Sequence, residues 1–557
     1  MTELVLPGVF IEVRPEGLIV PGAISVGTLG VVGTAAKGPV GEPQLLGGYS
    51  DALATFGPYD TWVDGASGEL TLTRALEQAY RAGATTVWAV RVAAGSAQRA
   101  GLDLAAAGGP NVRVEARSEG TWGNAVTVEV STADANALVR GEEVGGAPPA
   151  LAHSPVIQSA VNRIVVRPGG GGAETVLPIV YDTAPSPTQV AITTADGALT
   201  FGGTAPGGGD TIVATYMVDR SAAVKVTVKH GLAVEEEYNV VSGDDLIDDL
   251  EADSALVTAT AGTSAGEVPS TLDATPLTGG ANGADDPTGT LHATGLDALL
   301  GVDAHIIVVA GQDAGTIGDD LAAHCTVASS NDNKRERIAV VGTALEDDRS
   351  DFVQDASSHN LNSDRVVLVG PGFVADDRSA SPPVKVTLPG AYTAAVVAGM
   401  MSSLAPHVSL TNKVVPVEGL EHELSSAELK QLLLSRVVPV ERRQGFRIVR
   451  GITTSTNTAW QQITTRRIVD YAKYGVRSSA TPYIGLLNNV RVRGALHTTL
   501  NNFFNGMVLA EMLAPENGYQ VLVTATRDDE IRGIVRVEVR LRPTFSIDFI
   551  VVTMFLE

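Results

Sequence analysis

The last 27 residues of the chain, 531–557, constrain its fold more than any other stretch. From Val535 to Arg542 apolar residues alternate with charged ones, and this period of two is typical of a half-buried strand. Pro543 then removes a backbone donor and ends the strand or places it at a sheet edge. The chain is apolar at nearly every position from Phe549 to Leu556, and exposing seven such side chains would forfeit on the order of 10–20 kcal/mol. We therefore expect this segment to be buried in a sheet of its own subunit or of a neighbour.

Residues 1–22 are the second unusual segment, because three Pro-Gly or Pro-x-Gly breaks leave no room for a helix. Val9, Ile11 and Val13 share one face of an extended chain, and Phe10 lies on the other face. We predict an extended arm with a reach of roughly 60 Å when fully straight. The alternative is an edge strand on the chain's own sheet, and the pattern alone favours that alternative.

Between these segments the patterns of strands and helices alternate as in an α/β protein. Buried strands are expected at 25–34, 85–92, 305–310, 338–341 and 365–369, and helices at 71–82, 318–329 and 350–359. This order predicts an α/β core with a mixed sheet flanked by helices. Further along we expect helices at 391–404, from Ser426 onward, at 463–474 and at 494–513, a strand at 447–454, and an antiparallel pair at 520–526 and 531–541.

The stretch from about residue 131 to 297 has a different composition. It is rich in Gly, Ala, Thr, Ser and Pro and contains only short alternating runs, which predicts an all-β surface insertion. We therefore divide the chain into an N-terminal extended arm (1–22), a first core part (23–105), a peripheral β-rich insertion (106–298), a second core part (299–420), a C-terminal α/β domain (421–542) and a C-terminal extended arm (543–557).

Charge narrows the classes of partner. The chain carries a net charge of −24, yet from Arg436 onward 16 Lys and Arg face 10 Asp and Glu. Such an acidic chain is a poor candidate for nucleic-acid binding, whereas the basic C-terminal part suits either an acidic partner or ordinary surface arginines. No uncharged apolar stretch reaches about 18 residues, and Pro7 and Gly8 interrupt the first apolar run. We expect synthesis in the cytoplasm and no insertion into a membrane.

The motifs of common enzymes and metal sites do not occur. Residues 30–39 resemble a phosphate-binding loop, but Pro39 stands where the motif needs a hydroxyl residue and a helix start. Neither G-x-S-x-G nor H-E-x-x-H is present, and the paired aspartates do not match the EF-hand spacing. His324 and Cys325 are adjacent, which is poor geometry for one metal ion, so we interpret them as structural helix residues. We predict no catalytic residue, no cofactor and no metal.

Several segments in order resemble one family. They are PGVFIEVRPEG near the start, GVVGTAAKGPVGEP, SEGTWGNAVTVEV, RIVRGITTSTNTAWQQITTRRIVDYAKYGVR and FNGMVLAEMLAPENGYQVLV. Together they are similar to contractile tail sheath proteins of phages, R-type tailocins and phage-like injection systems, over about residues 1–130 and 300–557. Some members carry Trp-Gly-Ala-Arg-Thr where this chain has residues 450–454, RGITT, which places it in a different branch.

The resemblance implies a mechanical role without an enzymatic step. Family members form stacked hexameric rings around an inner tail tube, contact baseplate and terminator proteins, and exchange strands with neighbouring subunits by β-augmentation. It implies inter-subunit arms that contain Val9, Phe10, Ile11, Val13, Phe545, Ile547, Phe549 and Val551. It implies an acceptor sheet that contains Val521, Val523, Val535, Val537 and Val539. The basic residues Arg466, Arg467, Lys473 and Arg477 are candidates for facing the tube.

Two other classes stay open. A capsid-like or surface structural protein would also suit the Gly-rich β segments and the acidic charge. An α/β hydrolase is a weaker alternative, because no nucleophile motif is recognisable.

Overall fold

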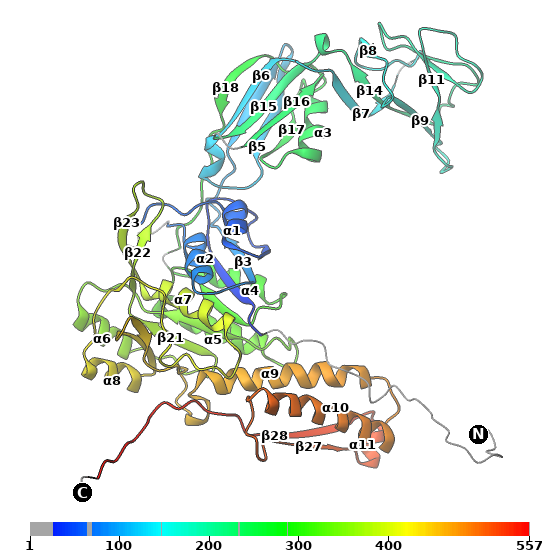
Figure 1. Cartoon of the computed structure of the whole chain (residues 1–557). Coiled ribbons are helices and arrows are strands. Elements are labelled where there is room, and N and C mark those ends of the chain that lie inside the picture. The colour runs from blue at the N-terminus through cyan, green and yellow to red at the C-terminus, as the bar shows by residue number, and fades with distance from the viewer. Residues whose placement is uncertain (1–25, 64–68, 146, 232–233, 287, 556–557) are drawn as a thin grey trace, which may run out of the picture. The chain divides into compact units, whose positions relative to one another are not determined.

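The computed structural model describes residues 26–63, 69–145, 147–231, 234–286 and 288–555 (Figure 1). They divide into two compact units. The first unit comprises the described parts of residues 1–35, 40–94 and 284–557, and the second comprises those of 36–39 and 95–283. The expected N-terminal arm, with Val9, Phe10, Ile11 and Val13, lies outside the described residues. None of the described helices combines the length and the apolar run that crossing a bilayer requires.

An eight-stranded mixed sheet forms the centre of the first unit. In spatial order its strands are β2 (Pro43–Leu46), β3 (Val87–Val92), β1 (Leu29–Thr34), β19 (Ile306–Val309), β20 (Ile338–Gly342), β21 (Val366–Gly370), β25 (Val437–Arg442) and β26 (Phe446–Ile448). The six inner strands run parallel, and the two outer strands β2 and β26 run antiparallel to their neighbours. The inner strands are nearly continuous runs of Val, Ile, Leu, Ala and Gly, as expected for strands that are covered on both faces.

Helices cover both faces of this sheet, so each face has its own apolar core. One face is packed by α1 (Tyr49–Phe56), α2 (Leu72–Arg81) and α7 (Gly390–Ser403), and the other by α4 (Thr290–Leu299), α5 (Ala314–Ala328), α6 (Arg349–Ser357) and α8 (Ser426–Leu434). Helix α8 begins at the expected position, Ser426, after a capping box between Ser425 and Glu428. A Cβ on Gly399 of α7 would lie 2.3 Å from the carbonyl oxygen of Ala79, so this glycine lets α7 and α2 pack closely. A small sheet of β22 (Phe373–Asp377), β23 (Val384–Leu388) and β24 (Gly419–Leu420) completes this region.

The strand predicted at 447–454 is wrong beyond Ile448. The N–H of Thr453 donates to the carbonyl of Gln461, and the N–H of Thr454 donates to that of Val366. The backbone of residues 449–462 is therefore used in a linker between the sheet and the next helix. Because β25 and β26 extend the eight-stranded sheet, the C-terminal domain begins after this linker instead of at residue 421.

The second unit contains two apolar cores. The first lies between the four-stranded sheet β16–β15–β6–β18, the three-stranded sheet β17–β5–β4 and helix α3 (Gly243–Asp253). The second lies within the sheets β10–β9–β14–β7 and β11–β12–β13. The bounds of these strands are, in chain order, β4 Gly101–Ala106, β5 Gly109–Ala116, β6 Val126–Thr132, β7 Ala137–Val144, β9 Arg163–Arg167, β10 Thr175–Leu177, β11 Ile179–Tyr181, β12 Val190–Ile192, β13 Leu199–Phe201, β14 Thr211–Val218, β15 Val224–His230, β16 Val234–Val240, β17 Val257–Ala261 and β18 Leu272–Pro276, with β8 (Val156–Ile157) beside β14.

Two expectations for this insertion need correction. Its compact unit spans 95–283 instead of 106–298, because α4 packs its apolar face on the eight-stranded sheet of the first unit. It is also not all-β, since α3 is a regular helix. Ser242 caps that helix by accepting from the N–H of Asp245, and Leu246 and Leu250 bury its apolar face.

The C-terminal domain has a third core within the first unit. The long helices α9 (Ile463–Ala480) and α10 (Val490–Leu509) pack together and against the strands β27 (Tyr519–Thr524) and β28 (Arg536–Leu541). The short helix α11 (Arg527–Ile531) joins the two strands. The Arg536 guanidinium and the Thr526 cap hold the pKa of the Asp529 carboxyl well below its usual range. The ion pair between Asp529 and Arg536 also connects α11 to the start of β28.

Candidate assembly interface

The hairpin of β27 and β28 brings together the five predicted acceptor residues. In its antiparallel register Val521 lies opposite Val539, and Val523 lies opposite Val537. These four valines and Val535 face α9 and α10, whereas the alternate side chains, among them Arg536, Glu538 and Arg540, are exposed. Of the five, only Val521 is fully buried, so the apolar face of the hairpin is incompletely covered.

Both outer edges of this hairpin are open within the described part of the chain, where β27 and β28 pair only with each other. A two-stranded sheet is marginally stable by itself, and each open edge presents backbone groups that a third strand satisfies. A groove of about 310 Å³ lies beside the hairpin and is lined by apolar side chains, including Ile484, Leu487, Leu496, Val535 and Val537. Open strand edges and an apolar groove therefore lie together on this domain.

The described residues that follow β28, 542–555, leave this domain as a tail without helix or strand (Figure 1). The base of the tail is fixed where the N–H of Thr544 donates to the carbonyl of Met512 over 3.1 Å. Beyond it, eight apolar side chains are 64–91% exposed. They are Phe545, Ile547, Phe549, Ile550, Val551, Val552, Met554 and Phe555. All four predicted residues of the C-terminal arm belong to this set, and none of the eight is buried within the subunit.

One polar residue interrupts the apolar tail. The Asp548 carboxylate lies 2.8 Å from Nε of Arg450 and 3.3 Å from Nε2 of Gln462, and its side chain is only 7% exposed. The prediction from sequence did not single out this residue. A lone charge inside an apolar run was the available signal, because such a charge needs a partner when it is covered.

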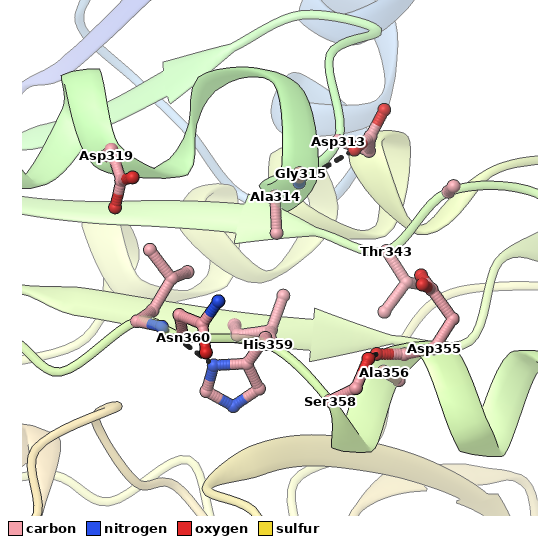
Figure 2. A pocket seen from close by; sticks show the side chains of 13 residues that line it. Asp313, Ala314, Gly315, Asp319, Thr343, Asp355, Ala356, Ser358, His359 and Asn360 are labelled. Carbon is pink, nitrogen blue, oxygen red and sulfur yellow. Dashed lines mark hydrogen bonds between the residues drawn. The ribbon is translucent and has the colours of Figure 1, made fainter.

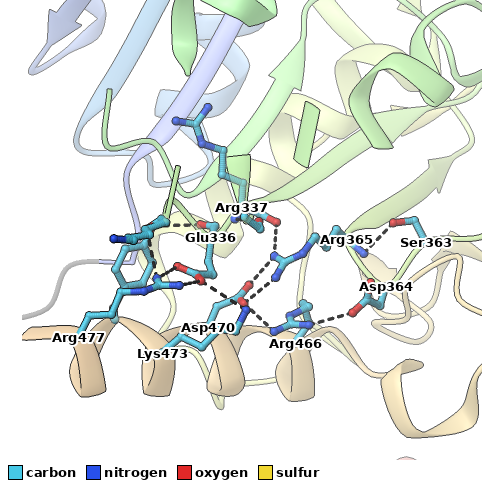
Figure 3. Close-up of polar contacts among 12 residues, drawn as sticks. Glu336, Arg337, Ser363, Asp364, Arg365, Arg466, Asp470, Lys473 and Arg477 are labelled. Carbon is cyan, nitrogen blue, oxygen red and sulfur yellow. Dashed lines mark hydrogen bonds and ion pairs between the residues drawn. The ribbon is translucent and has the colours of Figure 1, made fainter. Parts of the chain in front are cut away.

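Three of the four predicted tube-facing residues, Arg466, Lys473 and Arg477, join α9 to the eight-stranded sheet (Figure 3). The guanidinium of Arg365 binds both oxygens of Asp470 at 2.9 and 3.0 Å, and Arg466 binds Asp470 at 2.7 Å and Asp364 at 2.9 Å. Arg477 reaches Oε1 of Glu336 at 2.6 Å. This network connects the start of β20 and the start of β21 to successive turns of one helix.

Arg466 and Arg467 are buried, so we no longer propose them as tube contacts. Arg467 donates to the carbonyl of Leu404 at 3.0 Å, and burial lowers its pKa to about 10, so it stays charged at neutral pH. Lys473 and Arg477 are partly exposed and share Glu336. Burial alone would raise the pKa of the Glu336 carboxyl, but the hydrogen bonds and charge of Arg477 and the charge of Lys473 hold it below its ordinary value.

A cavity of about 190 Å³ lies between α5 and α6 beside the eight-stranded sheet (Figure 2). Ser358 and His359 line it, but they do not form a nucleophile and base. Nε2 of His359 bonds the carbonyl of Ser435 at 2.6 Å, and its Nδ1 accepts from the N–H of Leu361 at 3.1 Å. Ser358 donates to the carbonyl of Asp355. Both imidazole nitrogens are hydrogen-bonded to backbone groups, so His359 has a structural role.

His324 and Cys325 lie in α5 as structural residues. Nε2 of His324 is 2.8 Å from Arg337, and burial together with that cation lowers its pKa to about 4. Burial raises the pKa of the Cys325 thiol to about 12. Among the described residues, no group of three or more His, Cys, Asp or Glu side chains is placed to hold a metal ion.

Two regions of the chain match known families. Residues 285–454 match the phage tail sheath protein central domain, and residues 455–557 match the phage tail sheath C-terminal domain. The boundary between the two matches falls inside the linker at 449–462. No curated protein matches the sequence at a significant level.

Solved sheath structures share the fold. The sheath tail protein of Listeria innocua is 14% identical, with a TM-score of 0.58 over 94% of each chain. The sheath tail protein of Desulfitobacterium hafniense is 14% identical, with a TM-score of 0.56 over 92% of this chain and 93% of that one. The helical sheath of the anti-feeding prophage in its contracted state is 12% identical, with a TM-score of 0.50 over 99% of both chains. The mixed α/β architecture therefore matches the fold of sheath proteins.

Proposed function

The chain belongs to the phage tail sheath family through its central and C-terminal domains, and we propose that it is the subunit of a contractile sheath. In this proposal subunits polymerise as stacked hexameric rings around an inner tail tube, between a baseplate and a terminator. The sheath shortens and drives the tube through a target envelope, and it belongs to a phage tail or phage-like particle.

The observation that carries the proposal is that one subunit has both an exposed apolar tail, which can donate a strand, and a hairpin with open edges, which can accept one. The tail exposes eight apolar side chains, and the hairpin of β27 and β28 has two open edges and a half-covered apolar face. Exposure of the tail costs on the order of 10–20 kcal/mol relative to burial. Two complementary surfaces on identical copies favour association that propagates from copy to copy, because donor and receptor differ.

Strand addition supplies both energy and connectivity. A tail segment that pairs along one six-residue edge forms several main-chain hydrogen bonds, each worth about 0.5–1.5 kcal/mol net, and buries alternate side chains as well. The N-terminal arm at 1–22 is proposed to occupy another such edge. Linked strands keep neighbouring subunits attached while the rings rearrange, so the stored energy lies in subunit packing and no nucleotide is needed.

The test is electron microscopy of the purified chain with a matched pair of variants. Ile550 in the tail and Leu434 in α8 are both strongly exposed aliphatic residues of the isolated subunit. We expect the wild type and Leu434→Asp to form striated tubes, and Ile550→Asp and a chain ending at Asp548 to stay as folded monomers. Circular dichroism checks that each variant is folded. Closed shells from the wild type would instead favour a capsid-like protein, and normal tubes from both tail variants would remove the role of the tail.

A further inference from the structure

Asp548 stands out in the tail because it is held by its own subunit. It is the one charged residue between Pro543 and Phe555, and its side chain is 7% exposed while its apolar neighbours point into solvent. Its Oδ2 accepts hydrogen bonds from Nε of Arg450 at 2.8 Å and from Nε2 of Gln462 at 3.3 Å. Its Oδ1 accepts hydrogen bonds from the hydroxyls of Ser546 at 2.9 Å and Thr411 at 3.4 Å. The carboxylate is therefore satisfied on both oxygens.

Arg450 and Gln462, which bind Oδ2 of Asp548, lie on the linker and not on the hairpin from which the tail comes, whereas Thr411 precedes the linker and Ser546 belongs to the tail. Arg450 and Gln462 stand near the two ends of the linker at 449–462, which connects β26 of the eight-stranded sheet to α9. The same arginine also covers the ring of Phe549, with 5.5 Å from its guanidinium carbon to the ring centroid. The tail is thus attached at Thr544 beside the end of α10 and again at Asp548 on the linker, before it becomes free.

These two attachments separate the tail into a docked base, residues 543–548, and a free segment, residues 549–555. Tension applied to the free segment acts first on the contacts of Asp548. Without those contacts the tension would pass to the hydrogen bond between Thr544 and Met512 and then through Pro543 into β28, an outer strand of a two-stranded sheet. Strands of that kind are peeled one ladder bond at a time, whereas the linker that carries Arg450 is also bonded to an inner strand, because the N–H of Thr454 donates to the carbonyl of Val366 in β21.

We propose that Asp548 is a positioning residue: its clasp on Arg450 and Gln462 fixes where the donor segment leaves the subunit and passes tension from that segment to the linker instead of to β28. This inference rests on the proposed sheath function for its purpose. The clasp itself is a property of the single subunit and is tested separately.

The first experiment uses the monomer and chymotrypsin. A protease needs several extended residues beside the cleaved bond, so cleavage after Phe545 requires release of the docked base, while Phe555, whose preceding residues lie in the free segment, serves as the internal reference. We expect Asp548→Ala and Arg450→Ala each to accelerate cleavage after Phe545 about tenfold relative to Phe555, since each removes a charge-assisted contact. Thr553→Ala, an exposed polar residue of the same tail, is the matched control and leaves the ratio unchanged. An unchanged ratio in both clasp variants would overturn the clasp.

The second experiment uses the assembled protein. Asp548→Ala and Arg450→Asp are expected to reduce tube length several-fold, and the exchanged pair Arg450→Asp with Asp548→Arg restores it in part. In tubes of Asp548→Ala that do form, amide hydrogen exchange in residues 536–541 is faster than in the wild type. Normal tube length together with unchanged exchange in the single variants would refute the positioning role. If the wild type itself forms no tubes, the sheath function fails, and the proteolysis result alone decides whether the clasp exists.

Discussion

Replacing Asp470 by alanine is expected to destabilise the attachment of α9 to the eight-stranded sheet. Asp470 pairs with two arginines at once, Arg365 at 2.9 and 3.0 Å and Arg466 at 2.7 Å. The side chains of Arg365 and Asp470 are 9% and 10% exposed. Removing the carboxylate therefore leaves two guanidinium groups covered by protein with fewer partners than their charge requires.

The expected loss of stability follows from the contacts that the two arginines keep after Asp470 is removed. Arg466 keeps Asp364 at 2.9 Å, whereas Arg365 keeps only the carbonyl of Arg337 at 2.7 Å. Breaking a buried pair by removing one partner costs about 3–5 kcal/mol, because the other charge stays buried. Asp528 provides the matched control, since it pairs with Arg532 with both side chains 67% exposed, and such a surface pair is worth about 0–1 kcal/mol.

Urea denaturation of the monomer and amide exchange in α9 measure this difference. The ring of Trp460 lies 4.5 Å from the guanidinium carbon of Arg466, so tryptophan fluorescence reports on the network directly. We expect the transition that involves α9 to move to lower urea for Asp470→Ala and to stay in place for Asp528→Ala. A loss below about 1 kcal/mol for Asp470→Ala would refute the reasoning, because it would mean that water or rearrangement compensates both arginines.

Three further predictions concern other parts of the chain. Burial raises the pKa of the Glu69 carboxyl to about 8, with Asp60 and Asp377 adding to the shift and Arg74 opposing it. Because the folded pKa lies above the unfolded value, the stability of the wild type falls as the pH rises from about 5 to about 8. Thermal unfolding of Glu69→Gln should therefore show a weaker pH dependence and a higher midpoint than the wild type at alkaline pH. Replacing residues 95–283 by a short flexible linker should leave the first unit folded and able to form tubes, since its cores contain no residue of the second unit. Circular dichroism measures the fold and electron microscopy the tubes, and loss of either would contradict this prediction. Deleting residues 1–20 should give a folded subunit that forms no long tubes, and tubes of normal length would overturn the proposed arm.

Much of the core could be predicted because its signals are local. β-branched runs such as those of β1 and β20 are recognisable without knowing their partners, and the capping box at Ser425 marks the start of α8 within four residues. Helix α3 was missed because acidic residues mask a short apolar face of Leu246 and Leu250. The strand expected at 447–454 failed because its apolar residues serve a linker whose hydrogen-bond partners are distant in sequence.

The basic residues of α9 show where sequence reasoning stops. Their spacing identified an amphipathic helix, but Arg466 finds Asp364 about a hundred residues away, and Arg477 finds Glu336 farther still. Charge alone does not distinguish a free basic face from one that is neutralised inside the subunit, because that depends on which strands end beside the helix.

The sequence by itself determined that the C-terminal segment is apolar, broken from its strand by Pro543, and costly to leave in water, since these are properties of side chains and of proline. Only the tertiary structure decided that the subunit leaves this segment uncovered, that the hairpin beside it has open edges, and that Asp548 holds its base to the linker. The physical reason is that solvent exposure and ion pairing depend on how segments distant in the chain pack in space.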